Sequence, residues 1–465
     1  MEFWESGLIV NALLLAALMA AGAALRMTPP LRKLGIPGAI LGGCLGLLLG
    51  PSVLGLVPLQ IPTLENIVYH GLAIVFIAVA LQSPRGGGGG ERSGGAFSIA
   101  LAIPFFLTVQ AAAGMLVVLA LSLHPGFGLL LALGFEQGPG QALSMGAAWE
   151  PTGLTDGSQI GLIIAAIGFG WSIFVGIPLV LWGRRRGLTT DLSQFAELTS
   201  PSSEAGAGGP GEPGSLEGLT SQIVAIAIAY LLTYGLVSVV GDALLGAGKE
   251  GLAHTVYGFH FIVGALGGML VRTVLSRAPV ESPLDDRLLS RISGLAVDVV
   301  TCAAISAVQI EVLGANLVPI LGVTFAGGLV TLVGVLWLSP RAFKTAPFEH
   351  CVLLFGTVTG TLPMGLALLR ILDPEMRSPV SINAVLGSAM SIPFAAVFLM
   401  GMMPFTIDGW PDGYPTTGLI ALGLFVGYGA VLLAVWRLLG ALRFTSPLSI
   451  WPVEKSKAPD TRSVG

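Results

Sequence analysis

Long apolar stretches alternate with short polar loops along most of the chain. A helix needs about 20 apolar residues to span a bilayer, so each long stretch predicts a crossing. Before a polar segment at 184–218, the predicted crossings are 8–25, 36–51, 64–82, 97–122 and 158–182. After it they are 220–245, 256–275, 289–312, 315–338, 380–404 and 416–441. The pattern predicts an all-α polytopic membrane protein.

Two further apolar stretches, residues 126–152 and 347–373, are broken near their centres by glycine and proline. The first contains GFEQGPGQALSMGAAWEP, residues 134–151, where a glutamate and two glutamines interrupt an apolar run. Irregular backbone is tolerated in a membrane only where protein or a cavity satisfies its polar groups. We therefore expect two re-entrant hairpins, whose tips offer free backbone groups to a solute and a coupling ion. Close helix packing or a simple kink is the alternative explanation of the same residues.

Composition supports the membrane assignment. Hydrophobic residues make up 54% of the chain and charged residues 10%, whereas about a quarter of an ordinary soluble domain is charged. The net charge of −4 is small and spread out, so it predicts no nucleic-acid partner and leaves the lipid bilayer as the main environment. Glu2 and Glu5 stand where a secretory signal needs positive charge, so we expect the first apolar run to be retained.

The distribution of basic residues predicts the orientation. Cytoplasmic loops of membrane proteins carry an excess of Lys and Arg. With the N-terminus outside, eleven crossings and two hairpins place all of the 22 Lys and Arg except Lys249 on the cytoplasmic side. Counting either broken stretch as a full crossing would spoil that partition. The expected location is a bacterial inner membrane, with the C-terminus in the cytoplasm.

Similar segments recur in the same order in both halves. GIPGAILGGCLG at 35–46 resembles FIVGALGGMLV at 261–271, and HGLAIVFIAVALQ, ending at Gln82, resembles SGLAVDVVTCAAISAVQ, ending at Gln309. Five crossings per half is an odd number, so the second copy is expected to lie upside down relative to the first. Inverted repeats with interrupted segments meeting near the midplane are typical of transporters.

The predicted organisation follows from these repeats. Residues 1–183 form the first repeat with a hairpin at 126–152, and residues 219–405 form the second with a hairpin at 347–373. Residues 184–218, rich in Ser, Gly, Pro and Glu, are expected to be a flexible cytoplasmic linker. Residues 406–442 contain an extra transmembrane helix, and residues 443–465 form a cytoplasmic tail.

The broken stretches resemble those of the bacterial sodium/glutamate symporters, the glutamate:sodium symporter family. GTVTGTLPMGLALLRI, residues 356–371, looks like a Gly-rich stretch of that family and matches it at Gly360 and Pro363. GPGQ, residues 138–141, falls where the family has Gly-His-Gly-Thr, so its two glycines match. The likeness covers roughly residues 5–405.

The resemblance implies a homodimeric secondary transporter with hairpins in a mobile core that moves like an elevator against a scaffold. It implies symport of a small organic anion or amino acid such as glutamate, with Na⁺, or alternatively H⁺, as the coupling ion and no other cofactor. Pro139, Gln141, Leu362, Met364 and Leu368 replace polar residues of the family pattern. Either the solute differs and is more apolar, or other groups bind it.

Glu136 and Asp298 are the ionisable residues within apolar segments that most strongly indicate function, because such groups are costly in a membrane. Either residue is a candidate Na⁺ ligand, and Glu136 is also a candidate proton carrier. A water-filled vestibule or a buried cation beside Glu136, and a packed hydrogen bond between Asp298 and Thr301, are the alternatives. Arg370 would suit a carboxylate, although a position near the inner surface also explains it.

The predicted substrate- and ion-binding residues come from both broken stretches and one predicted crossing. They are Glu136, Gln137, Gly138, Gly140, Gln141, Ser144, Asp298, Thr301, Thr357, Thr359, Gly360, Thr361, Pro363 and Arg370.

Two other classes of function compete with the transporter. A channel or sensor built on a degenerate transporter fold would explain the replaced polar residues. An integral-membrane enzyme would use Glu136 and Asp298 as acid and base, but no His-rich metal cluster and no Gly-x-Ser-x-Gly motif accompanies them in the sequence. We therefore expect a transporter and no catalytic residues.

Overall fold

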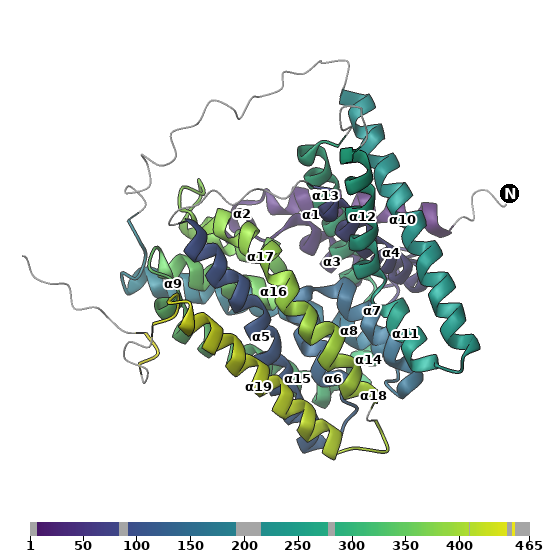
Figure 1. Cartoon of the computed structure of the whole chain (residues 1–465). Coiled ribbons are helices and arrows are strands. Elements are labelled where there is room, and N and C mark those ends of the chain that lie inside the picture. Colours follow the sequence, from purple (N-terminus) through teal and green to yellow (C-terminus); the bar gives the residue numbers. More distant parts are fainter. Residues whose placement is uncertain are drawn as a thin grey trace, which may run out of the picture.

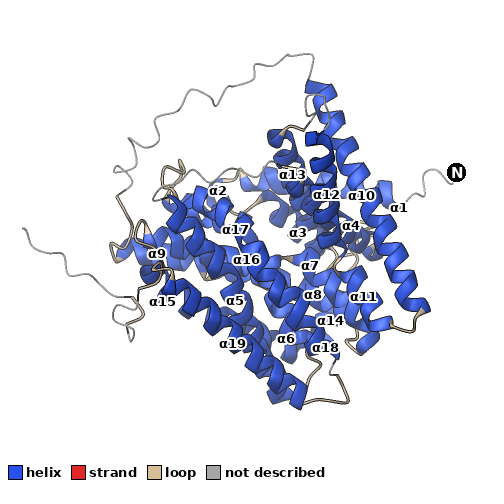
Figure 2. Cartoon of the chain, in the orientation of Figure 1, coloured by secondary structure: helices blue, strands red, loops and turns tan. Residues whose placement is uncertain are grey.

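The computed structural model describes residues 7–82, 92–191, 215–277, 284–408, 410–443 and 449–451. Every regular element in these ranges is helical (Figure 2). Ten of the described helices are long and apolar enough to cross a membrane. The prediction of an all-α, multi-pass membrane protein is therefore confirmed.

The first half contains six helical regions in order. They are α1 (Gly7–Arg26) with the short α2 (Pro29–Leu34), α3 (Gly38–Leu49), α4 (Ile61–Ala80), α5 (Arg92–Leu121), a broken region, and α8 (Gly157–Phe174) with α9 (Gly176–Arg185). The broken region consists of α6 (Gly126–Ala132), the π-helix η2 (Leu133–Gln137), α7 (Pro139–Trp149) and a 3₁₀ turn, η3 (Glu150–Thr152).

The second half follows the same order of long, short and broken helices. It contains α10 (Ser215–Gly246), α11 (Glu250–Gly258), α12 (His260–Arg277), α13 (Asp286–Ser306), α14 (Ile310–Ala315), α15 (Leu317–Ala342), α16 (Pro347–Leu372) and α17 (Val380–Ala396). A π-helix, η5 (Val397–Met402), and α18 (Met403–Asp408) continue α17, and α19 (Thr416–Leu438) stands where the extra helix was expected.

Two predicted crossings differ from the structure. The stretch at 36–51 forms α3, whose 12 residues rise only about 18 Å, short of a hydrocarbon core of about 30 Å. The stretch at 256–275 forms α12, which has 18 residues, carries Arg272 and Arg277, and is not among the ten candidate spans. Helix Pro347–Leu372 qualifies as a span by length and composition, although its backbone breaks in the middle, as described below.

The helices pack into two bundles with the broken region of the first half between them (Figure 1). In the first bundle α4 packs on α12 and α13, α3 packs on α1 and α13, and α10 packs on α12. In the second bundle α5 contacts α15, α17 and α19. The first-half broken region joins them, because α6 packs on α5 whereas α7 packs on α8, α4 and α11.

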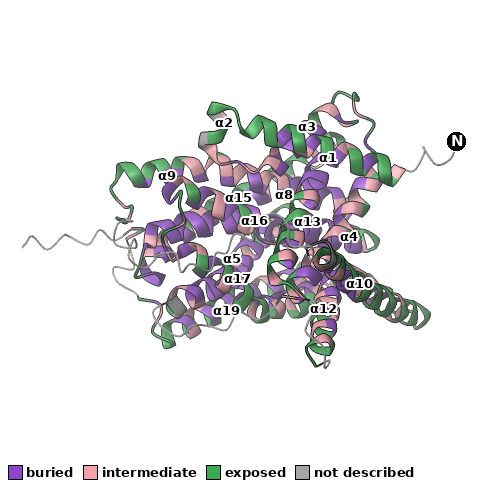
Figure 3. Ribbon diagram, turned by 90° about the horizontal axis from the view of Figure 1, so that it is seen from above, coloured by how far each residue is buried: buried purple, intermediate pink, exposed green. Residues whose placement is uncertain are grey.

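Burial follows this arrangement. Figure 3 shows buried residues gathered in the centre and exposed residues along the outward side of α10. The exposed side chains of α10 are themselves apolar, for example Leu231 and Val239, each with 68% of its surface accessible. Large accessible apolar side chains on a long apolar helix are expected where lipid is the solvent.

The described ends of the predicted linker lie in helices or contact the folded protein. Arg184 and Arg185 belong to α9, and α10 already begins at Ser215. Beyond α9, Thr190 binds the buried Glu349 at the start of α16. The central part of the predicted linker, 192–214, and residues 444–448 and 452–465 of the predicted tail lie outside the described residues.

Candidate functional site

The first broken region leaves the helical conformation at Gly138. This residue has φ 89° and ψ 179°, a left-handed region that glycine enters without the cost borne by other residues. Pro139 then begins α7, at the first helical position, where a missing N–H is tolerated. The sequence GPGQ therefore produces a sharp break between two half-helices.

The two ends of this region return to the same place. The Oγ1 atom of Thr152 lies 3.2 Å from Nε2 of His124, and a methyl group added to Gly126 would lie 2.7 Å from a Cδ atom of Leu154. Residues that precede α6 and residues that follow α7 are thus in contact. The chain folds back on itself with Gly138 at the turn.

The second broken region folds back more tightly. Within α16 the backbone is non-helical at Gly360 and Thr361, and Thr361 has φ 69° and ψ 169°, close to the values at Gly138. A methyl group on Gly365 would lie 2.5 Å from the carbonyl oxygen of Leu353. In a straight helix these two residues would be about 18 Å apart, so the half-helices on either side of Thr361 lie against each other.

The two turns meet in the interior. A methyl group on Gly138 would lie 2.7 Å from Cγ2 of Thr361. Helix α8 packs beside both regions: Gly168 faces Phe135 and the carbonyl oxygen of Thr359, and Ser172 Oγ lies 2.7 Å from Thr359 Oγ1. Each turn brings the carbonyl end of one half-helix beside the N–H end of the next, so partial charges of both signs gather at this point.

A chain of polar side chains extends from the first turn along α7. Gln141 Nε2 donates to Gln137 Oε1 at 2.9 Å, and Gln137 Nε2 donates to Glu136 Oε1, also at 2.9 Å. Glu136, Gln141 and Ser144 are only 6%, 2% and 1% exposed. Three buried oxygens here have no hydrogen-bond partner among the described residues, namely Glu136 Oε2, Gln141 Oε1 and, further along α7, Ser144 Oγ.

A second polar centre joins the second broken region to the second bundle. Gln110 of α5 donates from Nε2 to Thr331 Oγ1 of α15 at 2.9 Å and to the carbonyl oxygen of Val358 at 2.6 Å. Its own Oε1 is buried and has no partner among the residues that the structure describes. Gln110 and Thr331 were not predicted as site residues, although a glutamine within the apolar stretch 97–122 is itself an indication of function or helix contact.

The structure brings most of the predicted site residues to these two turns. Gly140 packs against Leu72 of α4. Thr357 and Thr359 are buried and donate to the carbonyl oxygens of Leu353 and Phe355. Thr361 is half-buried and Pro363 is exposed just after the turn.

Asp298, Thr301 and Arg370 lie elsewhere. Asp298 is on an exposed face of α13, within electrostatic range of Arg26, while Thr301 is half-buried one turn further on. The described residues contain no group of three or more His, Cys, Asp or Glu placed to hold a metal ion. Arg370 is exposed near the end of α16, away from the turn at Thr361. Glu136 thus remains as the buried carboxylate at the turns.

Glu349 is a second buried carboxylate that the sequence analysis did not single out. It is 1% exposed, and both of its oxygens are occupied: Thr190 donates from its backbone N–H at 2.7 Å and from its hydroxyl at 2.9 Å. Glu349 therefore fastens the segment after α9 to the start of α16. Its complete pairing contrasts with the half-paired Glu136.

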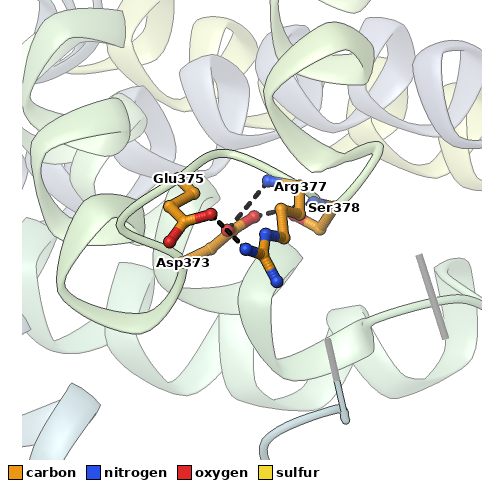
Figure 4. Close-up of polar contacts among 4 residues, drawn as sticks. All are labelled: Asp373, Glu375, Arg377 and Ser378. Carbon is orange, nitrogen blue, oxygen red and sulfur yellow. Dashed lines mark hydrogen bonds and ion pairs between the residues drawn. The ribbon is translucent and has the colours of Figure 1, made fainter. Parts of the chain in front are cut away.

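The loop after α16 is held by local contacts (Figure 4). The buried Asp373 accepts hydrogen bonds from the backbone N–H of Arg377 at 2.9 Å and of Ser378 at 2.8 Å. Arg377 also forms an ion pair with Glu375. These contacts define the connection between the second broken region and α17.

Comparison of the chain with models of known protein families, with curated proteins and with solved structures finds no match. The class that the fold defines is a multi-pass helical membrane protein. The resemblance to the sodium/glutamate symporters stays a prediction.

Proposed function

We propose that this chain is an ion-coupled secondary transporter of a small organic solute, built from two inverted repeats whose re-entrant hairpins meet at the binding site. The observation that carries the proposal is the contact between the two turns, Gly138 and Thr361, beside the half-paired Glu136. Interrupted helices that present half-helix ends to a central site are the usual device for binding solute and ion together in secondary transporters.

The order and packing of the helices support the repeat. Helices α3 and α4 correspond in order to α12 and α13, and the contacts between halves are exchanged accordingly: α3 packs on α13, and α12 packs on α4. The two turns also share nearly the same backbone angles. Such paired features are expected of two copies of one unit related by a pseudo-twofold axis.

The positions of the two bundles support movement of one part against another. The broken regions lie against α5, α15 and α8, and α7 faces α4 and α11 of the first bundle. In the proposed cycle the hairpins move with the second bundle, as in an elevator, past a scaffold of α1, α3, α4, α10, α12 and α13. A homodimer formed through the scaffold, Na⁺ or H⁺ as coupling ion, and an organic anion or amino acid as solute are the further expectations from the resemblance.

The test is solute uptake by proteoliposomes that contain the purified full-length protein. Radiolabelled amino acids and small organic acids are supplied under an imposed Na⁺ gradient, an imposed proton gradient, or neither. Accumulation that needs one gradient and disappears with the matching ionophore supports the proposal. Uptake that never exceeds equilibrium under either gradient would instead support a channel or a sensor.

A further inference from the structure

The polar side chains of η2 and α7 leave a single kind of buried atom without a hydrogen-bond partner among the described residues. The buried side-chain atoms that lack a partner in the described part of the chain, Glu136 Oε2, Gln141 Oε1 and Ser144 Oγ, are all oxygens. The amide nitrogens of Gln137 and Gln141 both donate in the direction of Glu136. This direction places a hydrogen-bond donor beside one oxygen of Glu136 and leaves acceptors without partners further along.

Among the side chains described at the two turns, the formal charge is also one-sided. Glu136 forms no ion pair with any described residue. Arg370, the basic residue closest in sequence to the second turn, is exposed and lies towards the end of α16. A buried carboxylate without a counter-charge is costly, so a ligand that supplies a positive charge gains the most from binding here.

The half-helix ends offer little to a second carboxylate. Pro139 and Pro363 stand in the first turns after the two breaks, and proline has no N–H to donate. Each half-helix therefore begins with fewer donors than usual. A dicarboxylate or an acidic amino acid would add negative charge beside Glu136 with few groups to receive it.

We propose that the solute of this site carries a protonated amino group and no net negative charge, with Glu136 as the counter-charge and Gln141 and Ser144 as further acceptors. The proposal rests on the proposed function for the transport cycle, but it concerns only which solute binds. It departs from the organic anion that the family resemblance implies.

The test is thermal stabilisation of the full-length protein in detergent by four probes, with and without Na⁺. Butylamine, glutamine, glutamate and glutarate differ chiefly in the charges they carry, and a ligand that binds the folded state raises the melting temperature. Butylamine and glutamine should stabilise the protein more than glutamate and glutarate. A larger shift with glutamate or glutarate, or no shift with butylamine and none with glutamine, would overturn the proposal.

A pair of variants separates the role of Glu136 from a general effect of removing a buried charge. Glu136→Gln should weaken the apparent affinity for the amines by about tenfold or more, since a hydrogen bond to a charged group is lost. Glu349→Gln removes an equally buried carboxylate whose oxygens are occupied by Thr190, and it should leave amine binding unchanged. If the Glu349→Gln protein cannot be purified, Thr190→Ala serves as the control instead. Undiminished amine binding by Glu136→Gln would contradict the proposal.

The binding result and the transport result are independent. Amine binding without gradient-driven uptake would leave the charge assignment standing and remove the transporter. Gradient-driven uptake of glutarate or glutamate that does not depend on Glu136 would support the transporter and contradict the charge assignment.

Discussion

Replacing Glu136 with Gln should stabilise the ligand-free protein, although it removes a residue of the proposed site. Glu136 is 6% exposed, and one of its carboxylate oxygens has no hydrogen-bond partner in the described ranges. The substitution keeps the acceptor for Gln137 and replaces the unpartnered oxygen with an NH₂ group. The unpartnered atoms nearest in sequence are Gln141 Oε1 and Ser144 Oγ. Both can accept a hydrogen bond from the new NH₂ group.

The expected size follows from the cost of an unsatisfied buried group, which is about 1–3 kcal/mol and larger for a charged one. Glu136→Gln should therefore raise the free energy of unfolding by about 1–3 kcal/mol at pH 8. The matched change Glu349→Gln should have the opposite sign. The carboxylate oxygens of Glu349 accept hydrogen bonds from the N–H and hydroxyl of Thr190 at 2.7 and 2.9 Å. The substitution weakens one of these bonds, and a hydrogen bond to a charged group is worth about 1.5–3 kcal/mol.

The assay compares apparent melting temperatures of the purified proteins in one detergent at one heating rate, because membrane proteins often unfold irreversibly. The order should be Glu136→Gln above wild type above Glu349→Gln. A melting temperature of Glu136→Gln below that of the wild type would show that Glu136 is well satisfied in the folded protein. Glu136 would then have no unsatisfied oxygen to offer a ligand.

Three further predictions concern the turns and their surroundings. Gly138→Ala should lower the melting temperature and abolish uptake, since its methyl group would lie 2.7 Å from Thr361 Cγ2 and its backbone angles cost a non-glycine residue about 1–3 kcal/mol. Adding Thr361→Gly should restore part of the stability by removing the clash, and no rescue would count against contact between the turns. Gln110→Leu should destabilise the protein by about 1–3 kcal/mol, because Gln110 is the donor to Thr331 and Val358; an unchanged melting temperature would contradict this. Burial lowers the pKa of His124 to about 4, so the neutral ring contributes stability that is complete above pH ~6.5 and is lost as the pH falls towards 4. The wild type should therefore lose more thermal stability than His124→Gln between pH 7 and 5, and equal losses would exclude this role.

The hydrogen bonds of His124 also favour its neutral form. Its Nδ1 accepts a hydrogen bond from the N–H of Gly126 at 3.0 Å, and its Nε2 lies 3.2 Å from Thr152 Oγ1. A doubly protonated ring has no acceptor for Gly126. Protonation would therefore break the hydrogen bond from Gly126, which positions the His124 ring for its contact with Thr152.

Local sequence was sufficient to predict most of the long apolar helices and the two stretches in which the helical backbone breaks. Runs of about 20 apolar residues form the long helices because a chain in lipid must satisfy its own backbone hydrogen bonds. Gly138 and the pair Gly360 and Thr361 interrupt the helices within the two stretches that the sequence singled out. Helix length was less well determined: the run at 36–51 is apolar throughout, yet only Gly38–Leu49 is helical as α3.

Only the tertiary structure decided which polar residues come together. In a membrane the residues that face lipid are as apolar as those that face protein, so the sequence carries no polar stripe from which to read the rotation of each helix. Glu136 and Asp298 look alike in sequence, each a single carboxylate in an apolar run, but one is buried beside the turns and the other is exposed on α13. Gln110 reaches the second turn only because α5 packs against α15 and α16. Apolar patterning thus determined that the chain is a membrane protein with two interrupted helices, whereas packing determined that the interruptions meet and which side chains surround them.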